Sequence, residues 1–403
     1  MDKDQRMTLD RDAALSWYVR NRERSRTLFA MLPESAYYER PIDLRHPIVF
    51  YDGHLPGFSF NTLVKKAAGG ASIDPRLESL FARGIDPHES QASGGSLSWP
   101  ARDAVRDFVA EADARVIDTL RTMDVGREPV YTILEHEAMH QETLLYMWHR
   151  LPFDQKKQPA GYAPATDGRV PRQDWIEIPA GRATLGVDEG TLPFAWDNEM
   201  PAFVVDVAGF AIQKHDVTNA QYLEFVESGA PAPSFWERVG DRWFWRGMFA
   251  QIPLPLSWPV YVTQAEASAY AQWRGWRLPT EAEYQRAAVG AASVVCDFSS
   301  WDPEPAGSHP EGASRYGVED LVGNGWEWTS TAFAPFPGFR ASVSYPEYSA
   351  DFFDGEHFVM KGASPATARE LIRPSFRNWF RPRYPYVYAT FRCARSERSR
   401  GTK

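Results

Sequence analysis

Apolar residues recur every three or four positions in the first part of the chain, the spacing that predicts helices with one buried face. The pattern covers residues 10–32, a shorter stretch near 44–67, a stretch that follows Pro100, and residues 128–151. In the third of these, the apolar face is formed by Val105, Phe108, Val109, Ala112, Val116 and Leu120. Pro100 is expected in the first turn of that helix, where its missing N–H costs little. The four elements predict a four-helix bundle over residues 1–153, a scaffold that often builds metal sites from inward side chains.

The pattern changes after this bundle. Residues 154–173 are rich in Pro, Gly and charge without a periodic apolar pattern, which predicts a linker. Residues 174–398 contain short strand-like runs such as WIEIPAG, FVVDVAGFAI and HFVMKG, separated by Gly, Pro and Trp. Capping boxes that announce short helices pair Thr218 with Gln221, Thr263 with Glu266 and Thr280 with Glu283. We therefore expect one α+β domain over residues 174–398.

Composition narrows the classes of function. A net charge of -9 and a pI near 5.6 argue against a nucleic-acid surface, which needs clustered Lys and Arg. Two cysteines, Cys296 and Cys393, are too few for a disulfide scaffold and fit a reducing cytosol. The charged N-terminus lacks a signal peptide, and no apolar run reaches the roughly 18 residues of a membrane span. We expect a cytoplasmic protein that acts on small molecules and binds neither nucleic acid nor membrane.

A candidate metal site lies in the last helix of the bundle, in the run LEHEAMHQE. His136 and His140 are four residues apart, so both imidazoles project from one face of that helix, with Cβ atoms about 6 Å apart. Ile133, Leu144 and Met147 continue this face with apolar groups, which predicts that the pair is buried. Two histidines at this spacing also occur without a metal, so the spacing alone does not establish a site.

A third ligand is available in the segment RHPIVFYDGHLPGF, which contains His46 and His54. Three imidazole nitrogens with open coordination positions suit either iron(II) and oxygen chemistry or zinc. Glu137 and Glu142 are candidates to accept hydrogen bonds from ligand N–H groups, and simple solvation is the alternative for both.

The run HEAMH is also a literal HExxH, the zinc-protease pattern in which Glu137 would be the general base. One class of these enzymes has its third ligand six residues after the second histidine, but this position is Tyr146. A downstream glutamate ligand on a second helix is not visible either. A zinc hydrolase is therefore the less favoured alternative.

The chain resembles, over nearly its whole length, the sulfoxide synthases of ergothioneine and ovothiol biosynthesis. In the first half the resemblance rests on FYDGHLPGF and LEHEAMHQETLLYM. In the second half it rests on IPAGRATLG, HDVTNAQYLEFVESG, WRLPTEAEYQRAA, LVGNGWEWTS, FVMKGAS and RPSFRNWF followed by FRCAR. It implies a multidomain α and α+β fold, in which a DinB-like four-helix bundle precedes a C-type-lectin-like domain similar to formylglycine-generating enzyme, the sulfatase-modifying factor.

The resemblance also implies a site and a reaction. The family's three iron(II) ligands match His54, His136 and His140, and leave His46 outside. The family uses iron(II) and dioxygen to add a chalcogen to the imidazole carbon between the ring nitrogens of hercynine. Asn378 and Trp379 match residues that contact this substrate, whose trimethylammonium group favours aromatic faces. Core packing is the alternative role for Trp379 and for the adjacent Phe380.

Three positions depart from the family pattern. Met139 replaces a glutamine that touches the betaine substrate in many ergothioneine synthases. Phe380 replaces an aspartate that helps to hold γ-glutamylcysteine, which leaves cysteine or a selenium donor open. Tyr388 stands where formylglycine-generating enzymes have the earlier of two cysteines, so that activity is not expected and Cys393 is expected to be a small buried apolar residue.

The donor and the catalytic tyrosine are the remaining expectations. The runs LRHPIVFYDGHLPGFSFN and HEAMHQETLLYM look most similar to the selenoneine synthase branch, which joins a selenosugar to hercynine. A carbon–sulfur bond to cysteine or γ-glutamylcysteine is the alternative. The family's catalytic tyrosine lies in the loop before FVMKG, where Tyr345 and Tyr348 are both candidates.

Overall fold

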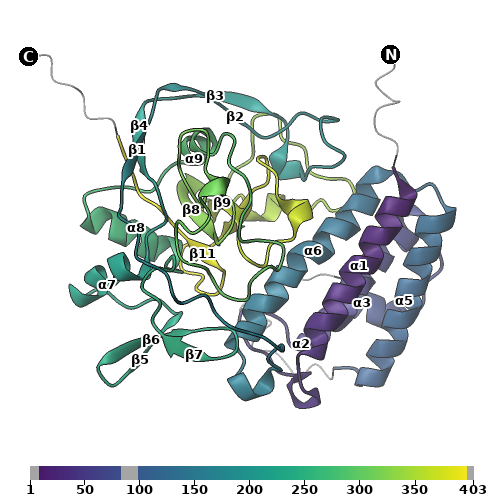
Figure 1. Ribbon diagram of the computed structural model, residues 1–403. Coiled ribbons are helices and arrows are strands. Elements are labelled where there is room, and N and C mark those ends of the chain that lie inside the picture. Colours follow the sequence, from purple (N-terminus) through teal and green to yellow (C-terminus); the bar gives the residue numbers. More distant parts are fainter. Residues whose placement is uncertain (1–8, 83–98, 397–403) are drawn as a thin grey trace, which may run out of the picture. The chain divides into compact units, whose positions relative to one another are not determined.

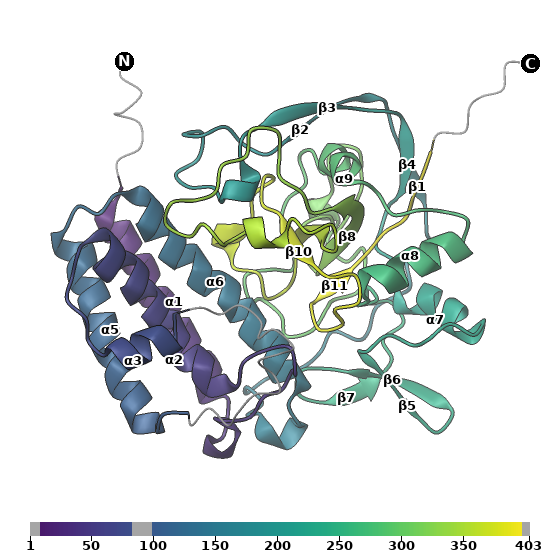
Figure 2. The same ribbon diagram turned by 180° about the vertical axis from the view of Figure 1, so that it is seen from behind.

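The computed structural model describes residues 9–82 and 99–396, and the chain divides into two compact units after Ala160. The first unit is helical, and the second combines short strands with short helices (Figures 1 and 2). The predicted fold class, a helical domain followed by an α+β domain, is confirmed. The predicted domain limits, 1–153 and 174–398, stay a prediction.

Four long helices lie side by side in the first unit (Figure 1). They are α1 (Arg11–Ala30), α2 (Ile48–Ser59), α5 (Arg102–Thr122) and α6 (Arg127–Arg150). Both α1 and α2 pack on α5 and on α6, which confirms the four-helix bundle. The shorter elements are η2 (Glu34–Ala36), the π-helical η3 (Phe60–Ala67), α3 (Pro75–Leu80) and η4 (Phe153–Gln155).

Two helix starts differ from the prediction. The helix α5 begins at Arg102 with Ala101 as its N-cap, so the expectation that Pro100 lies in the first turn is wrong. Ala101 has extended backbone angles, which place Pro100 outside the helix. The helix α2 begins at Ile48 because Pro47 is extended and its ring disfavours helical angles in the residue before it.

Two glycines on α2 allow a close approach of the segment that follows α3. A Cβ atom on Gly53 would lie 2.4 Å from the ring of Phe81, and one on Gly57 would lie 3.2 Å from the Cβ atom of Phe81. Real Cβ contacts are essentially never as short as the first of these, so only glycine fits at position 53 without a shift. The glycines of FYDGHLPGF therefore let Phe81 pack against the helix that carries His54.

The described part of the second unit, residues 161–396, contains four small sheets. Their strand orders are β1-β4-β12, β10-β9-β8-β11, β2-β3 and β5-β6-β7. The strands are β1 (Trp175–Ile178), β2 (Gly181–Leu185), β3 (Phe203–Val207), β4 (Phe210–Gln213), β5 (Trp236–Val239), β6 (Arg242–Arg246), β7 (Gln251–Pro253), β8 (Gly325–Ala332), β9 (Phe358–Ala363), β10 (Asn378–Phe380), β11 (Ala389–Thr390) and β12 (Ala394–Ser396). All pairs are antiparallel except β11 with β8, and β8 and β9 lie in the middle of the unit (Figure 1).

Short helices and turns surround these sheets. The helices are α7 (Asn219–Glu227), α8 (Gln264–Trp273) and α9 (Glu281–Ala287), and all three predicted capping boxes are present at their starts. The turns are η5 (Asp197–Glu199), η6 (Pro310–Gly312), η7 (Ala350–Phe352) and η8 (Arg369–Leu371). With so little regular structure, the core depends on large side chains and on ion pairs. Arg392, for example, is fully buried between Glu327 and Asp216.

No helix in residues 9–82 or 99–396 is both long enough and apolar enough to cross a membrane.

Candidate metal centre

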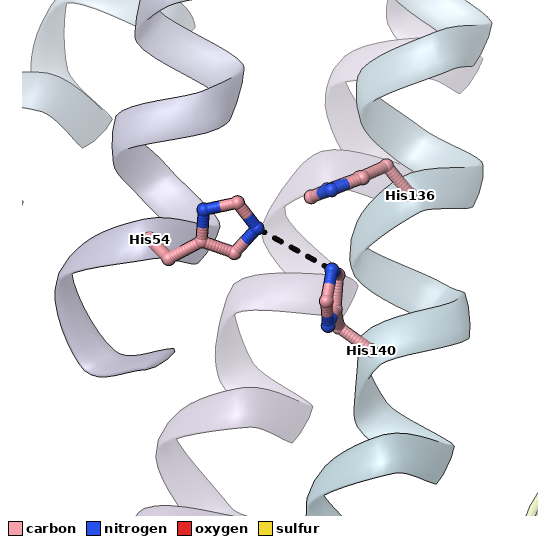
Figure 3. Close-up of side chains that lie close together, drawn as sticks. All are labelled: His54, His136 and His140. Carbon is pink, nitrogen blue, oxygen red and sulfur yellow. Dashed lines mark hydrogen bonds between the residues drawn. The ribbon is translucent and has the colours of Figure 1, made fainter. Parts of the chain in front are cut away.

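Three histidines of the first unit converge between two helices. His54 extends from α2, and His136 and His140 extend from α6, one turn apart (Figure 3). Each residue offers one ligand atom, and these atoms lie within 4.8 Å of one another. The ring centroids are 4.5 to 5.1 Å apart. Within the described residues, this is the one group of three or more His, Cys, Asp or Glu side chains that could hold a metal ion.

Hydrogen bonds orient the ring of His54. Its Nδ1 atom lies 2.8 Å from the carbonyl oxygen of Phe81. Because a carbonyl oxygen can only accept, Nδ1 carries the proton and donates it, and Nε2 presents a lone pair. That Nε2 atom lies 3.3 Å from Nε2 of His140, the contact drawn as a dashed line in Figure 3. The ring of His54 thus directs its unprotonated nitrogen toward the other histidines.

Burial keeps all three imidazoles neutral. Burial lowers the pKa of His54 to about 4, although the hydrogen bond to Phe81 acts in the opposite direction. Burial, followed by the neighbouring histidines, lowers the pKa of His136 well below its ordinary value. Burial likewise lowers the pKa of His140 well below its ordinary value, and His54 and Arg45 add to the effect. Neutral imidazole is the form that binds metal ions.

The donor set fits a bound metal ion. The buried Nδ1 atom of His140 has no hydrogen-bond partner in the described part of the chain. Two buried imidazoles, His54 and His136, beside the half-buried His140 and without a neighbouring carboxylate ligand, are costly unless a ligand satisfies their nitrogen atoms. His54, His136 and His140 are therefore suited to hold a divalent ion that accepts nitrogen ligands.

His46, the other candidate for third ligand, does not join this group. Its ring stacks on the ring of Phe50, with centroids 4.1 Å apart and planes at 27°. The structure thus brings His54, and not His46, to the pair on α6.

Glu137, the general base that a zinc hydrolase would require, is bonded to helix α1 instead. Its Oε1 atom accepts hydrogen bonds from Arg22 Nη1 at 2.9 Å and from Ser25 Oγ at 2.7 Å, both on α1. Burial raises the pKa of Glu137, while Arg22 opposes this shift. Because this carboxylate is engaged with α1, it does not accept hydrogen bonds from the histidines as expected. It is also poorly placed to be the general base for a water molecule on the metal. Glu142 is buried rather than solvated.

A buried ion-pair network behind the histidines was not predicted from the sequence. Arg22 Nε also donates to Asp113 on α5 at 2.8 Å, and Tyr18 Oη donates to the same carboxylate at 2.7 Å. Arg22, Asp113 and Glu137 therefore connect α1, α5 and α6. A signal was present, because Asp113 falls between Ala112 and Val116 on the apolar face of its helix.

In the second unit, Trp379 belongs to an aromatic group formed by Trp196, Phe333, Tyr348, Phe352 and Trp379. Trp379 lies on β10 and stacks on Phe333, with centroids 4.2 Å apart and planes at 6°. Tyr348 meets it edge-on at 5.2 Å. Phe352 lies against it at 5.7 Å. Tyr348, a candidate for the catalytic tyrosine, and Trp379, a candidate for substrate binding, thus lie in direct contact.

Tyr348 and Tyr345 differ in their surroundings. Tyr348 is buried and stacks on Trp196, with centroids 3.8 Å apart, while Tyr345 is partly exposed and lies 5.8 Å from Tyr348. The same loop is fastened by Asp197, which accepts from Ser349 Oγ at 2.5 Å and from the N–H of Ser342 at 3.2 Å. Trp196 and Asp197 were not singled out in the sequence, because they contact the loop from about 150 residues away.

The remaining candidate positions have ordinary surroundings. The Oδ1 atom of Asn378 accepts from the N–H of Trp379 at 2.9 Å. Phe380 stacks on Tyr384, with centroids 5.0 Å apart. Met139 precedes His140 on α6 and is partly exposed. Cys296 and Cys393 are buried free thiols, and burial raises the pKa of Cys393, as befits a small core residue.

Two family models match the chain. The sulfatase-modifying factor enzyme 1-like domain matches residues 162–397, more than half of the chain. The DinB superfamily matches residues 18–149. Among solved structures, PvdO from Pseudomonas aeruginosa aligns with a TM-score of 0.41 and 21% identity, over 55% of this chain and 94% of that chain.

Relatives align over both units. The hercynine oxygenase of Mycolicibacterium smegmatis is 34% identical over 370 residues, which cover 80% of this chain and 84% of the relative. The hercynine oxygenase of Mycobacterium tuberculosis is 31% identical and covers the same shares. Ergothioneine biosynthesis protein 1 of Schizosaccharomyces pombe is 28% identical over 91% of this chain, which spans 54% of that longer protein.

Proposed function

The chain belongs to the hercynine oxygenase family, a family of oxidative enzymes, and from this premise we propose that it is a non-haem iron(II) enzyme. Its proposed substrates are hercynine, dioxygen and a sulfur or selenium donor, and the new bond forms at the imidazole carbon between the two ring nitrogens of hercynine. The observation that carries the proposal is the convergence of His54, His136 and His140 as neutral imidazoles within one bundle.

The three histidines would hold the iron through nitrogen atoms. A set of three protein ligands leaves coordination positions open for other molecules. When bound, iron(II) supplies the activation of dioxygen and orients the chalcogen donor. The protein keeps the histidines unprotonated, because their burial disfavours the imidazolium form, and it fixes the tautomer of His54 through Phe81.

Trp379 and Asn378 are the proposed contacts of hercynine. A trimethylammonium group cannot donate conventional hydrogen bonds and is attracted to the face of an aromatic ring, most strongly to tryptophan. Stacking on Phe333 holds the indole of Trp379 in one plane. The Oδ1 atom of Asn378 accepts a hydrogen bond from the N–H of Trp379. Its Nδ2 group is therefore the end that would donate to a substrate carboxylate. Met139, beside His140, is a further proposed contact.

Tyr348 is the tyrosine that we propose to be catalytic. It contacts Trp379 directly, whereas Tyr345 reaches the aromatic group through Tyr348. A phenol at this place would hold a proton beside the bound substrate. Tyr348→Phe should lower kcat strongly and leave the KM for hercynine nearly unchanged, and Tyr345→Phe should leave both unchanged. The reverse pattern would assign the role to Tyr345.

The donor that we propose first is a selenosugar. Phe380 supports this choice, because its ring packs on Tyr384 and offers no carboxylate to hold γ-glutamylcysteine. A sulfur donor is the second candidate, since some relatives are named for ergothioneine biosynthesis. In that case the product would contain a carbon–sulfur bond.

One experiment tests the reaction and the donor together. The protein is purified without oxygen, loaded with iron(II), and given hercynine with a selenosugar, cysteine or γ-glutamylcysteine in separate reactions. We expect oxygen consumption that requires hercynine, and a product whose mass contains the chalcogen of the best donor. The absence of a hercynine-dependent product with every donor would refute the proposed function.

A further inference from the structure

Helix α2 carries more of the histidine site than His54. Phe50 and Phe58 lie four residues before and four residues after His54, so the three side chains share one face of α2. Both phenylalanines are nearly inaccessible to solvent, with exposed fractions of 1% and 6%. Their rings contact the histidines rather than only filling the core.

Phe58 reaches from α2 to a histidine on α6. Its ring and the imidazole of His136 are stacked face to face, with centroids 3.6 Å apart and planes at 11°. Phe58 also lies 6.0 Å from the ring of His54, at a tilt of 58°. One face of the His136 ring is therefore covered by an apolar plane that belongs to the other helix.

Phe50 holds His54 in a similar way. The two rings are nearly parallel, at 18°, with centroids 5.0 Å apart. The ring of His46 also stacks on Phe50, with centroids 4.1 Å apart, so the ring of Phe50 contacts two imidazoles. His54 is thus held both by this ring and by the hydrogen bond from its Nδ1 atom to Phe81.

Ring orientation matters for a metal ligand. The last side-chain torsion of histidine has broad, shallow preferences, so the helix backbone alone does not define the plane of an imidazole. A ligand nitrogen must point its lone pair at the ion, and groups that fix ligand rings therefore affect metal affinity. A stacked phenyl ring limits this torsion and adds no competing hydrogen-bonding group.

We propose that Phe58 is a positioning residue of the metal centre, which holds the imidazole of His136 in its ligating plane, and that Phe50 does the same for His54. This inference rests on the proposed function, since it assumes that the histidines bind a metal. It goes beyond that function by assigning two apolar residues of α2 a role in metal affinity.

Cobalt(II) is a suitable probe, because its visible absorption reports the geometry of its ligands. Phe58→Leu keeps an apolar side chain but removes the ring. We expect Phe58→Leu to bind cobalt(II) about 10-fold more weakly, the lower end of the effect of removing a group that orients a ligand, with a changed absorption spectrum. Phe58→Tyr keeps the ring and should restore both affinity and spectrum.

Phe60→Leu is the matched control, because Phe60 is fully buried two residues along the same chain segment and lies outside these stacks. It should unfold at a lower temperature than the wild type and bind cobalt(II) with unchanged affinity. Should Phe58→Leu fail to fold, Phe58→Met fills more of the same space without a ring and is measured in its place.

Wild-type affinity and an unchanged spectrum in Phe58→Leu or Phe58→Met would overturn the positioning role. His136→Ala, titrated in parallel, separates this outcome from a failure of the proposed function. Equal cobalt(II) binding by the wild type and His136→Ala would show that the histidines are not the metal site. If His136→Ala loses cobalt(II) binding while the Phe58 variants keep it, the histidines remain the metal ligands and only the role of Phe58 is rejected.

Discussion

The two units present their candidate functional residues in different ways. In the first unit, the three histidines lie on two regular helices, and neighbouring groups orient the rings of His54 and His136. In the second unit, Trp379 lies on a three-residue strand and Tyr348 lies in a loop. The turn η5 holds that loop from a distant part of the sequence.

The roles proposed for the two groups would account for this difference. A metal ion requires ligand atoms placed to within about 0.5 Å, which regular helices provide better than loops. A trimethylammonium group is attracted to any aromatic face within about 6 Å, so its recognition tolerates a less regular frame. The metal site is therefore expected to be sensitive to single substitutions, and the aromatic group to lose binding gradually.

Removal of one histidine should have the largest effect. We expect His54→Ala, His136→Ala and His140→Ala each to lower the affinity for iron(II) by more than about 100-fold, because a missing ligand costs more than a missing supporting group. Iron content after anaerobic gel filtration measures this. His46→Ala is the control and should retain iron. Retention of iron by His54→Ala would show that α2 supplies no ligand to the metal.

Arg22→Ala should give an effect of similar size, on the stability of the bundle. The substitution leaves Asp113 and Glu137 as buried carboxylates without their shared guanidinium, and breaking such a pair costs about 3–5 kcal/mol. Urea unfolding measures the change. Arg26, which pairs with Asp113 from an exposed position, provides the control, and Arg26→Ala should cost at most about 1 kcal/mol. Equal losses in both variants would contradict a special role for Arg22.

Acid should lower the free energy of unfolding of the metal-free protein through His54. The pKa of His54 is lowered from 6.5 to about 4, so between these values the unfolded chain binds a proton that the folded protein excludes. The contribution of His54 is therefore complete above pH 6.5 and is lost as the pH falls toward 4, by on the order of 3 kcal/mol. Urea unfolding at several pH values should show a smaller loss in His54→Gln. An identical pH profile in both proteins would contradict this prediction.

Substitution of Trp379 should have the smallest of these effects. Trp379→Leu removes the aromatic face, and we expect the KM for hercynine to rise about 10-fold, which corresponds to about 1.4 kcal/mol. Trp379→Phe should restore most of the binding, and neither variant should change iron content. A loss of iron in Trp379→Leu would mean that the two groups are not independent.

Features that depend on local spacing could be predicted from the sequence. The helical intervals identified the bundle, and the three capping boxes identified the starts of α7, α8 and α9. The four-residue spacing of His136 and His140 predicted that they share a face. The resemblance to a family was needed to select His54 over His46, because both lie in the same short segment.

Features that depend on distant contacts could not be predicted. Phe81 accepts a hydrogen bond from His54 across 27 residues, and Arg22 meets Glu137 across 115 residues. The proposal of Tyr348 over Tyr345 required its contact with Trp379, which no sequence pattern places beside this loop. The prediction that Pro100 lies in the first turn was wrong for a local reason, because the extended angles of Ala101 delay the start of α5.

Oxygen consumption by anaerobically iron-loaded protein, with His54→Ala measured beside the wild type, tests most directly whether the histidines form an iron site for hercynine oxidation. We predict that the wild type consumes oxygen only when hercynine and a chalcogen donor are both present, and that His54→Ala consumes it no faster than a reaction without enzyme. Hercynine-dependent consumption by His54→Ala at the wild-type rate would contradict the proposed iron site.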